Sequence, residues 1–431
     1  MTIKVVHLNR WDIKGGAAIA AYRQHKALQQ VGLKSQMYVA EKLCDDESVL
    51  ELDIDALTSF DITHREVIRD KAKEITSKHA GAIRSDLGPF TLPFAPFGPR
   101  MIAQLPEADI INLHWVCGFV DYQEFFFHKK TAVPMIWTLH DMYPFTGGCH
   151  YAGACEKFIN ECGACPYISS ENQDDMSRFI HKTKHDAMSS TAYPITIVTP
   201  SKWLAKEARR SRIFGDMDIK VIPYSLNLDQ FKPRPQRAMR EYLDLPKDKV
   251  IGFFPSDHLS DPRKGIIYLE EALKCLTPEQ AANMLLVSVG NSERKLSGLV
   301  EQRSLSFISD PEIMSKIYNA SDFTFLPSLE DNLPNIILES MASGTPLIGF
   351  DTGGLPDFIK NGETGWIVPK RNVSQLASAI DDALSFPEKL IEMRRVVRNV
   401  AEREFAMKVQ GERYKDLYEQ TLENYHIRGN S

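Results

Sequence analysis

The strongest constraint on the fold is a pattern of short, continuously apolar runs that alternate with helical segments, in two separate series. Runs of strand length that stay apolar throughout are typical of parallel sheets covered by helices on both faces. The first series occupies residues 3–9, 35–40, 109–114, 135–140, 196–200 and 220–223, and the second occupies residues 250–255, 284–289, 305–309, 323–327, 346–350 and 365–368. The sequence therefore predicts an α/β protein in which βαβ units build two domains.

The length and the proline distribution predict where these domains end. A chain of 431 residues holds two or three domains of ordinary size. Four prolines from Pro223 to Pro246 indicate an interdomain linker. We expect a first domain at residues 1–224, a linker at 225–246, a second domain at 247–386, and a helical strap at 387–431 that packs back on the first domain.

The overall charge argues against a nucleic-acid partner. Lys and Arg number 51 against 57 Asp and Glu, which gives a formal net charge of −6, and neither half of the chain is basic. No apolar run approaches the roughly 20 residues that a membrane span needs. The first residues resemble a strand rather than a signal segment. We therefore expect a cytoplasmic protein without a transmembrane anchor.

The most informative segment, residues 323–346, leads from a predicted strand through a turn into a predicted helix. Pro334 stands near the first position of this helix, and Gly344 closes it. Backbone amides around Asn335 and Ile336 lack partners within the helix. Because they lie beyond the carboxyl end of a strand, they favour an anion there.

Charged side chains accompany this segment. Asp331 precedes the helix and Glu339 lies eight residues later, so the two carboxylates suit hydroxyl groups at opposite ends of an extended ligand. Arg263 and Lys264 stand beside Gly265 at the start of another helix, just after a strand. Side-chain charge and helix dipole therefore add in favour of phosphate groups.

These residues resemble the signature of family 4 glycosyltransferases, the retaining enzymes of the GT-B fold, whose motif is Glu-x7-Glu after a Pro-Ser strand end. Asp331 and Glu339 have this spacing, with Asp in place of the first Glu. Residues 351–359 resemble the Gly-Gly turn of the family, and residues 261–265 resemble its basic pair. The resemblance implies a GT-B fold, with two Rossmann-like doubly wound domains that face a central cleft.

The resemblance also implies roles for individual residues. In the family the first acid contacts the donor sugar, the second contacts the nucleotide ribose, and the basic pair grips the donor diphosphate. A His at the end of the fourth strand contacts the donor sugar near the reacting carbon. The candidate catalytic residues are thus His140, Arg263, Lys264 and Asp331. The candidate donor-binding residues are Gly15, Gly16, Asn332, Leu333, Asn335, Ile336, Glu339, Gly353 and Gly354.

Two features of the first half of the chain each have more than one interpretation. The loop after residues 3–9 ends at Gly15 and Gly16, where glycines let the backbone approach a donor phosphate or an acceptor closely. This is not the Gly-x-Gly-x-x-Gly pattern, so the dinucleotide fingerprint is absent from this loop. His140 closes a predicted strand, and a single His in such a place is equally compatible with a structural role.

Four of the seven cysteines fall within seventeen residues, at Cys149, Cys155, Cys162 and Cys165. In a reducing cytosol such clustering favours free thiols or a metal over disulfides. A structural zinc site is one interpretation, and small buried side chains in a core are the other. A catalytic zinc is not expected, because four Cys ligands leave no open coordination position.

An aromatic, proline-rich segment at residues 88–99 also has two interpretations. Its residues Phe90, Phe94 and Phe97 either contact a lipid-like or saccharide acceptor or pack on their own domain. The first interpretation is compatible with peripheral contact at the inner face of a membrane.

The function implied by the resemblance is retaining transfer of a hexose from a UDP- or GDP-sugar to a hydroxyl of a saccharide or lipid-linked acceptor. The family's common use is polysaccharide or glycoconjugate biosynthesis. No cofactor is expected for catalysis. Two alternatives stay open: a nucleotide-sugar epimerase of the GT-B fold, and a non-catalytic nucleotide-sugar-binding protein.

Overall fold

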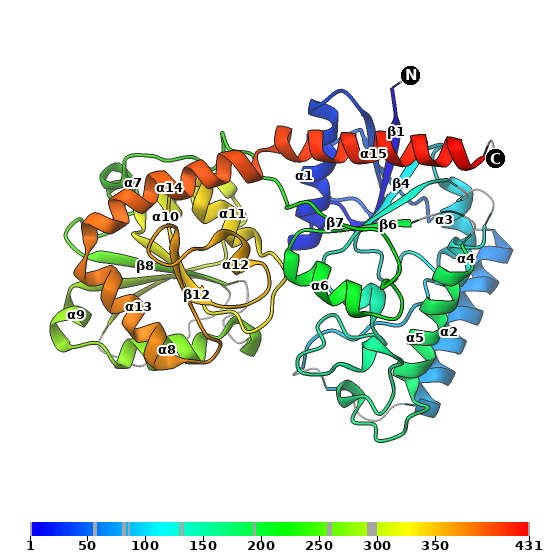
Figure 1. Cartoon of the computed structure of the whole chain (residues 1–431), viewed down its shortest axis with the longest axis horizontal. Coiled ribbons are helices and arrows are strands. Elements are labelled where there is room, and N and C mark those ends of the chain that lie inside the picture. Colours follow the sequence, from blue (N-terminus) through cyan, green and yellow to red (C-terminus); the bar gives the residue numbers. More distant parts are fainter. Residues whose placement is uncertain are drawn as a thin grey trace. The chain divides into compact units, whose positions relative to one another are not determined.

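A computed structural model describes residues 2–54, 58–79, 83–84, 87–128, 131, 133–191, 193, 195–256, 261–290 and 300–429. The chain divides into two compact units (Figure 1). The first contains residues Met1–Pro223 and Gln410–Ser431, and the second contains Tyr224–Val409. Each unit has its own sheet and its own hydrophobic core.

The described part of the first unit contains a parallel sheet of seven strands in the order β3-β2-β1-β4-β5-β6-β7. Its strands are β1 (Lys4–Trp11), β2 (Lys34–Glu41), β3 (Val49–Glu51), β4 (Ile110–Leu113), β5 (Met135–Thr138), β6 (Ile195–Thr199) and β7 (Ile219–Val221). Its helices are α1 (Gly16–Gln30), α2 (Ser59–His79), α3 (Gly98–Gln104), α4 (Tyr122–Phe125), α5 (Met176–Ser189), α6 (Lys202–Arg210) and most of α15 (Met407–Gly429).

The described part of the second unit contains a parallel sheet of six strands in the order β10-β9-β8-β11-β12-β13. Its strands are β8 (Val250–Pro255), β9 (Met284–Val289), β10 (Glu301–Leu305), β11 (Phe323–Leu326), β12 (Leu347–Phe350) and β13 (Gly365–Val368). Its helices are α7 (Gln236–Tyr242), α8 (Ile266–Lys274), α9 (Pro278–Ala282), α10 (Pro311–Ala320), α11 (Asn335–Ala342), α12 (Leu355–Phe358), α13 (Val373–Ser385) and α14 (Pro387–Phe405).

Helices cover both faces of the second sheet, as continuously apolar strands require. Figure 1 shows α8 and α13 on one side of this sheet and α10, α11 and α14 on the other. Every residue of β11 and β12 is buried. The prediction of two Rossmann-like, doubly wound units is therefore confirmed.

The polypeptide differs from the predicted elements at three places. The strand expected at residues 305–309 is β10, four residues earlier. The short strand β3 was not predicted, because three residues at the edge of a sheet carry too little periodicity to stand out. The expected linker contains α7, which packs on α10 within the second unit.

The predicted C-terminal strap consists of two helices that belong to different units. Helix α14 packs on α11 in the second unit, and the chain turns extended at Ala406. Helix α15 packs back on the first unit through Tyr414, Leu417 and Tyr418, which join the core formed by β1, β4, β5 and β6. A Cβ at Gly411 would come within 2.6 Å of the Ala27 carbonyl oxygen, so α15 lies directly against α1.

Candidate functional site

The candidate residues of the second unit lie at the switch point of its sheet. Strands β8 and β11 are neighbours, but the chain leaves β8 toward β9 on one side and reaches β11 on the other. Ligands of doubly wound sheets bind beyond the strand ends at such a point. The loops that follow β8, β11 and β12 carry the predicted basic pair, the predicted acid and the predicted Gly-Gly turn, respectively.

Two glycines let these three loops meet. Gly265 has a positive φ of 70°, and a Cβ there would lie 1.9 Å from the Pro327 carbonyl oxygen. Gly353 has a positive φ of 55°, and a Cβ there would lie 1.8 Å from the Asp331 carbonyl oxygen. Any other residue would push the loops apart, because the colliding atoms are backbone. Gly354 completes the contact by donating its amide to the Asn332 carbonyl at 2.6 Å.

The charged side chains at this point form two ion pairs. The Lys264 Nζ donates to Asp331 Oδ2 at 3.1 Å, across 67 residues of sequence. The Arg263 guanidinium instead contacts Asp261 Oδ2 at 2.8 Å, within its own loop. The Asp331 carboxylate raises the pKa of Lys264 above its ordinary value, so the ammonium stays protonated. Arg263 and Lys264 are thus adjacent but have different carboxylate partners.

Helix α11 supplies the remaining candidates of this unit. It begins at Asn335 after Pro334, has no side-chain cap, and carries no acidic residue in its first turn. The positive end of its dipole is therefore not offset by a carboxylate of its own first turn. Leu333 is buried beside it, whereas Asn335 and Ile336 are partly exposed.

Glu339 lies one turn further along α11. Its carboxylate accepts a hydrogen bond from the hydroxyl of Tyr318, on α10, at 3.3 Å. Tyr318 is fully buried, so it fixes the carboxylate from the core side. Tyr318 was not among the predicted site residues.

In the first unit the loop after β1 reaches helix α1 through the predicted glycines. Gly15 precedes the helix with a φ of 86°, a conformation that favours glycine, and Gly16 begins it. Both residues are exposed, and the first turn of α1 carries no acidic side chain. The buried carboxylate of Asp12 anchors the loop by accepting the amides of Leu43 and Cys44.

His140 lies two residues beyond the end of β5 and is buried. Its Nε2 stands 3.1 Å from the Nδ1 of His114, whose Nε2 stands 2.8 Å from the Nδ1 of His7. Burial lowers the pKa of His140 from 6.5 to about 4, against a partial opposing effect of Asp141. Burial likewise lowers the pKa of His7 and His114 well below the ordinary value, so all three rings are neutral at pH 7.

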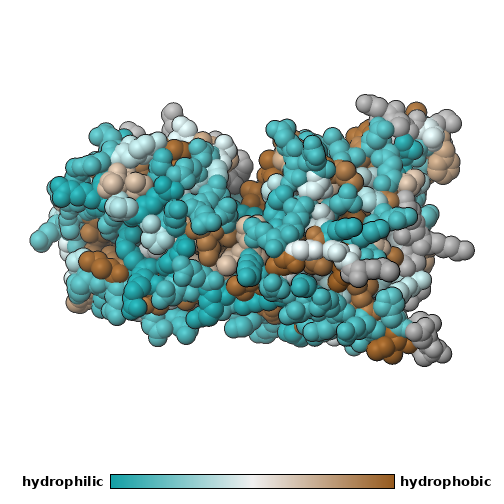
Figure 2. Space-filling model, turned by 90° about the horizontal axis from the view of Figure 1, so that it is seen from above, coloured by the Kyte–Doolittle hydropathy of each residue, from teal (hydrophilic) through white to brown (hydrophobic). Residues whose placement is uncertain are grey.

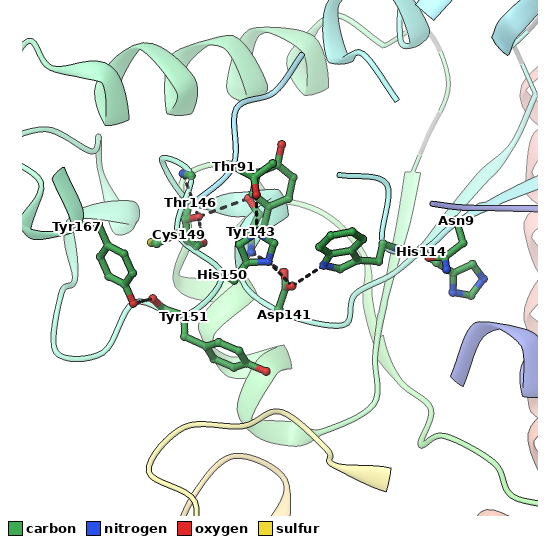
Figure 3. A network of polar contacts seen from close by, with 12 residues as sticks. Asn9, Thr91, His114, Asp141, Tyr143, Thr146, Cys149, His150, Tyr151 and Tyr167 are labelled. Atoms are coloured by element: carbon green, nitrogen blue, oxygen red, sulfur yellow. Dashed lines mark hydrogen bonds and ion pairs between the residues drawn. The ribbon is translucent and has the colours of Figure 1, made fainter. Parts of the chain in front are cut away.

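A second polar network holds the residue next to His140 (Figure 3). Asp141 Oδ2 accepts from His150 Nδ1 at 2.7 Å and from Trp115 Nε1 at 3.0 Å, and its Oδ1 accepts the amide of Tyr143. His150 Nε2 in turn lies 2.9 Å from the Thr91 hydroxyl. Burial alone would raise the pKa of Asp141, but His150 and the other donors lower it, so the carboxylate is ionised.

The four clustered cysteines surround one small cavity. Cys149, Cys155, Cys162 and Cys165 all line it, and its volume of about 20 Å³ has room for a single atom of water's size. All four are free thiols. Among the residues that the structure describes, however, no three His, Cys, Asp or Glu side chains stand together in a way that could hold a metal ion.

The aromatic residues of segment 88–99 pack on their own unit. Phe94 is buried, and Phe90 and Phe97 lie against the same core. The ring of Phe90 contacts that of Tyr167, and Phe94 contacts Phe179. The second of the two interpretations of this segment therefore agrees with the structure.

The structure thus gathers the predicted residues into two groups, one at the carboxyl edge of each sheet. Sequence reasoning missed Tyr318 and His114, which contact the predicted Glu339 and His140. It also missed His7, which contacts His114, and the residues Trp115 and His150, which contact Asp141 beside His140. One sequence feature indicated that histidines gather in the first unit: ten of the twelve His residues precede Tyr224.

Comparison with known proteins connects the site of the second unit to one family. Residues 248–385 match the family described as Glycosyl transferases group 1. The D-inositol 3-phosphate glycosyltransferase of Corynebacterium jeikeium is 28% identical over 217 residues, which cover 47% of this chain and 52% of that protein. The chain spans about half to two thirds of the length of the first curated relatives that it matches.

Solved structures share the fold over nearly the whole chain. Sucrose-phosphate synthase from Thermosynechococcus elongatus is 19% identical with a TM-score of 0.66, over 97% of this chain and 98% of that one. HepE of Anabaena, solved in complex with UDP-glucose, is 14% identical with a TM-score of 0.62, over 97% and 100%. At such identities the likeness concerns the fold.

These findings confirm the resemblance drawn from the sequence. Residues 248–385 form a domain of the group 1 glycosyl transferases, in a chain that has the GT-B fold. None of the helices described in the structure is both long enough and apolar enough to cross a membrane. Hydrophilic residues predominate on the face drawn in Figure 2.

Proposed function

We propose that this protein is a retaining glycosyltransferase that moves a hexose from a nucleoside diphosphate sugar to a hydroxyl of a saccharide or lipid-linked acceptor. The observation that carries the proposal is the meeting of three loops at the switch point of the second sheet, through Lys264, Asp331 and Gly353. The family match covers all three loops. The UDP-glucose held by a structure of the same fold supports a nucleotide sugar as the donor.

The ion pair of Lys264 and Asp331 suits two neighbouring parts of one donor. An ammonium favours phosphate oxygens, and a carboxylate accepts hydrogen bonds from sugar hydroxyls. The two groups are in direct contact at 3.1 Å, so both can reach neighbouring parts of one ligand. We assign Lys264 and Arg263 to the diphosphate, Asp331 to the sugar, and Glu339 to the ribose.

Stabilisation of the leaving diphosphate is the main catalytic effect in this proposal. Negative charge grows on the diphosphate as the anomeric C–O bond breaks, so cations aimed there act more strongly in the transition state than in the ground state. Lys264, Arg263 and the positive end of the α11 dipole provide such groups without a metal. The remaining donor contacts come from the backbone around Asn332, Leu333, Ile336, Gly353 and Gly354.

The acceptor hydroxyl attacks the anomeric carbon on the face from which the diphosphate departs. A new C–O bond forms as the bond to the diphosphate breaks, and the hydroxyl proton passes to the departing phosphate oxygen. The configuration is therefore retained without a carboxylate nucleophile, which a retaining glycosidase would need about 5 Å from its acid.

The first unit contributes His140 and the loop at Gly15 and Gly16 to the donor sugar and the acceptor. A cytoplasmic location, with peripheral contact at the inner face of a membrane, suits a lipid-linked acceptor. We also propose that the four cysteines hold a structural zinc ion, supported by the cavity that all four of them line. Binding would require the thiols to draw closer together, since no three of them stand in metal-holding positions.

The test is incubation of the purified full chain with a panel of UDP- and GDP-sugars, with and without saccharide and lipid-linked acceptors. Proton NMR of the product reads the new anomeric linkage. We expect transfer that depends on an acceptor and keeps the donor configuration. Conversion of a nucleotide sugar without any acceptor would establish an epimerase instead, and an inverted linkage would exclude the retaining mechanism.

A further inference from the structure

The three imidazoles at the switch point of the first sheet form a continuous row. Strand β1 has β2 on one side and β4 on the other. The chain leaves β1 toward β2 and later returns on the opposite side of β1 at β4. His7 lies on β1, His114 directly after β4, and His140 shortly after the next strand, β5. Successive ring centroids are 5.1 and 5.4 Å apart, and the nitrogens face one another at 2.8 and 3.1 Å.

A row of neutral imidazoles has a direction. Each contact needs one N–H and one bare nitrogen, and each neutral ring carries a single N–H. The protons therefore sit either all on Nδ1, so that the bonds run from His7 toward His140, or all on Nε2, so that they run the other way. The two arrangements differ at the ends of the row.

The inner end of the row decides between these arrangements. His7 Nε2 is buried without a hydrogen-bond partner among the described residues. If the protons sat on Nε2, this atom would be a buried donor without an acceptor, which native structures avoid more strictly than a bare acceptor. The favoured arrangement therefore has His7 Nδ1–H donating to His114 Nε2, and His114 Nδ1–H donating to His140 Nε2.

We infer that His114 and His7 are positioning residues that hold His140 as a neutral imidazole protonated on Nδ1. The inference rests on the proposed function for the part that His140 plays in turnover. With Nε2 accepting from His114, the single N–H of the His140 ring is on Nδ1. A neutral ring carries no positive charge that would attract the phosphates of the donor molecule.

The neighbouring carboxylate leaves this arrangement intact. Asp141 adjoins His140 in sequence, and an ionised carboxylate bonded to that ring would favour the imidazolium. Its two oxygens instead accept from His150, Trp115 and the Tyr143 amide. The hydrogen bonds of Asp141 thus belong to a separate network, and its charge only partly opposes the effect of burial on the pKa of His140.

The experiment uses the full chain labelled with 15N in its histidine rings. Long-range proton–nitrogen NMR at pH 7 distinguishes the two neutral tautomers and the imidazolium, and the signals missing from His140→Gln identify that ring. We expect His140 as the Nδ1–H tautomer in the wild type and in His114→Asn, whose amide can still donate at the place of Nδ1. In His114→Leu we expect this single tautomer to be lost.

Turnover provides the second readout. His114→Leu should lower kcat by roughly tenfold, the weight of one buried hydrogen bond, with little change in KM for the donor. In the double variant with His140→Gln, the His114→Leu change should lower kcat no further, because His114 acts through the His140 ring. The matched control is His181→Leu, which removes another buried imidazole of the same unit that lies outside the row.

Three results would overturn the inference: an Nε2–H tautomer or an imidazolium at His140, a tautomer that His114→Leu leaves unchanged, or fully additive losses in the double variant. If no variant and no wild-type protein transfers sugar, the proposed function fails, while the NMR result still decides the state of the row.

Discussion

At the switch point of the second sheet the candidate residues are charged, whereas at that of the first sheet they are neutral. Lys264 and Asp331 face each other as ions, and a carboxylate keeps the lysine protonated. Burial lowers the pKa values of the His7, His114 and His140 rings, so all three are neutral at pH 7. Two parallel sheets with the same strand order around the switch point thus provide a charged environment in one unit and a neutral one in the other.

A fall in pH should produce the largest difference in stability between the two units. Burial lowers the pKa of His25, His140 and His181 from 6.5 to about 4, and that of His7 and His114 well below 6.5. Between the unfolded and the folded pKa the unfolded chain binds more protons. Stability that is present above about pH 6.5 is therefore lost as the pH falls toward about 4. Each such histidine contributes a loss of about 1.4 kcal/mol per pH unit in this window.

Hydrogen exchange of peptides from each unit is measured by mass spectrometry from pH 7 to 4.5 and corrected for the intrinsic exchange rate. It reports the stability of each unit separately. Residues 224–409 contain one histidine, His258, against ten before Tyr224. Peptides of the first unit should lose protection at a higher pH than those of the second. If the second unit instead lost its protection at the higher pH, the difference between the charged and the neutral switch point would be contradicted.

Replacing Lys264 should have the next largest effect. Lys264→Met removes the cation that faces the departing diphosphate, and we expect kcat to fall by about 100- to 1,000-fold. Stability should change little, because the ion pair is partly exposed. The matched control is Lys274→Met, which removes an exposed ammonium from α8. Equal turnover in the two variants would refute the assignment of Lys264.

The cysteine cluster offers a test of the first unit away from its switch point. Elemental analysis of protein purified without chelators should find near-stoichiometric zinc in the wild type and in Cys275→Ser, whose thiol is exposed elsewhere. Cys162→Ser should lose the zinc and lower the unfolding temperature of the first unit. Wild-type protein without zinc would end this proposal.

Glu339→Gln should produce the smallest of these effects. The carboxylate is assigned to one pair of ribose hydroxyls, so its loss should weaken UDP or GDP binding by roughly tenfold at most, as read by calorimetry. Glu392→Gln, an exposed change on α14, serves as the control. Unaltered affinity in Glu339→Gln would place the ribose elsewhere.

The sheets and their switch-point loops could be predicted because burial on both faces leaves continuous apolar runs in the sequence. The strand β10 was misplaced, since only one of its five residues, Leu305, is apolar and none of the five is buried. The pairing of Lys264 with Asp331 spans 67 residues and depends on two glycines that let backbones touch. No local pattern carries that information.

The imidazole row was hidden for a related reason. His7 lies within β1, and His114 and His140 each lie just after a strand, so only the strand order brings the three together. Likewise, the Arg263 guanidinium contacts Asp261, two residues away, a partner that the sequence analysis did not name. The sequence identifies a cation at this position, but it does not determine which carboxylate pairs with that cation.

Calorimetric titration of UDP and GDP into the wild type and into Lys264→Met tests the central claim most directly. We predict that one of the two nucleotides binds one site per chain and that Lys264→Met weakens it by roughly tenfold or more. Absence of binding by both, or the same affinity in both proteins, would contradict the claim that the charged switch point of the second unit binds a nucleoside diphosphate.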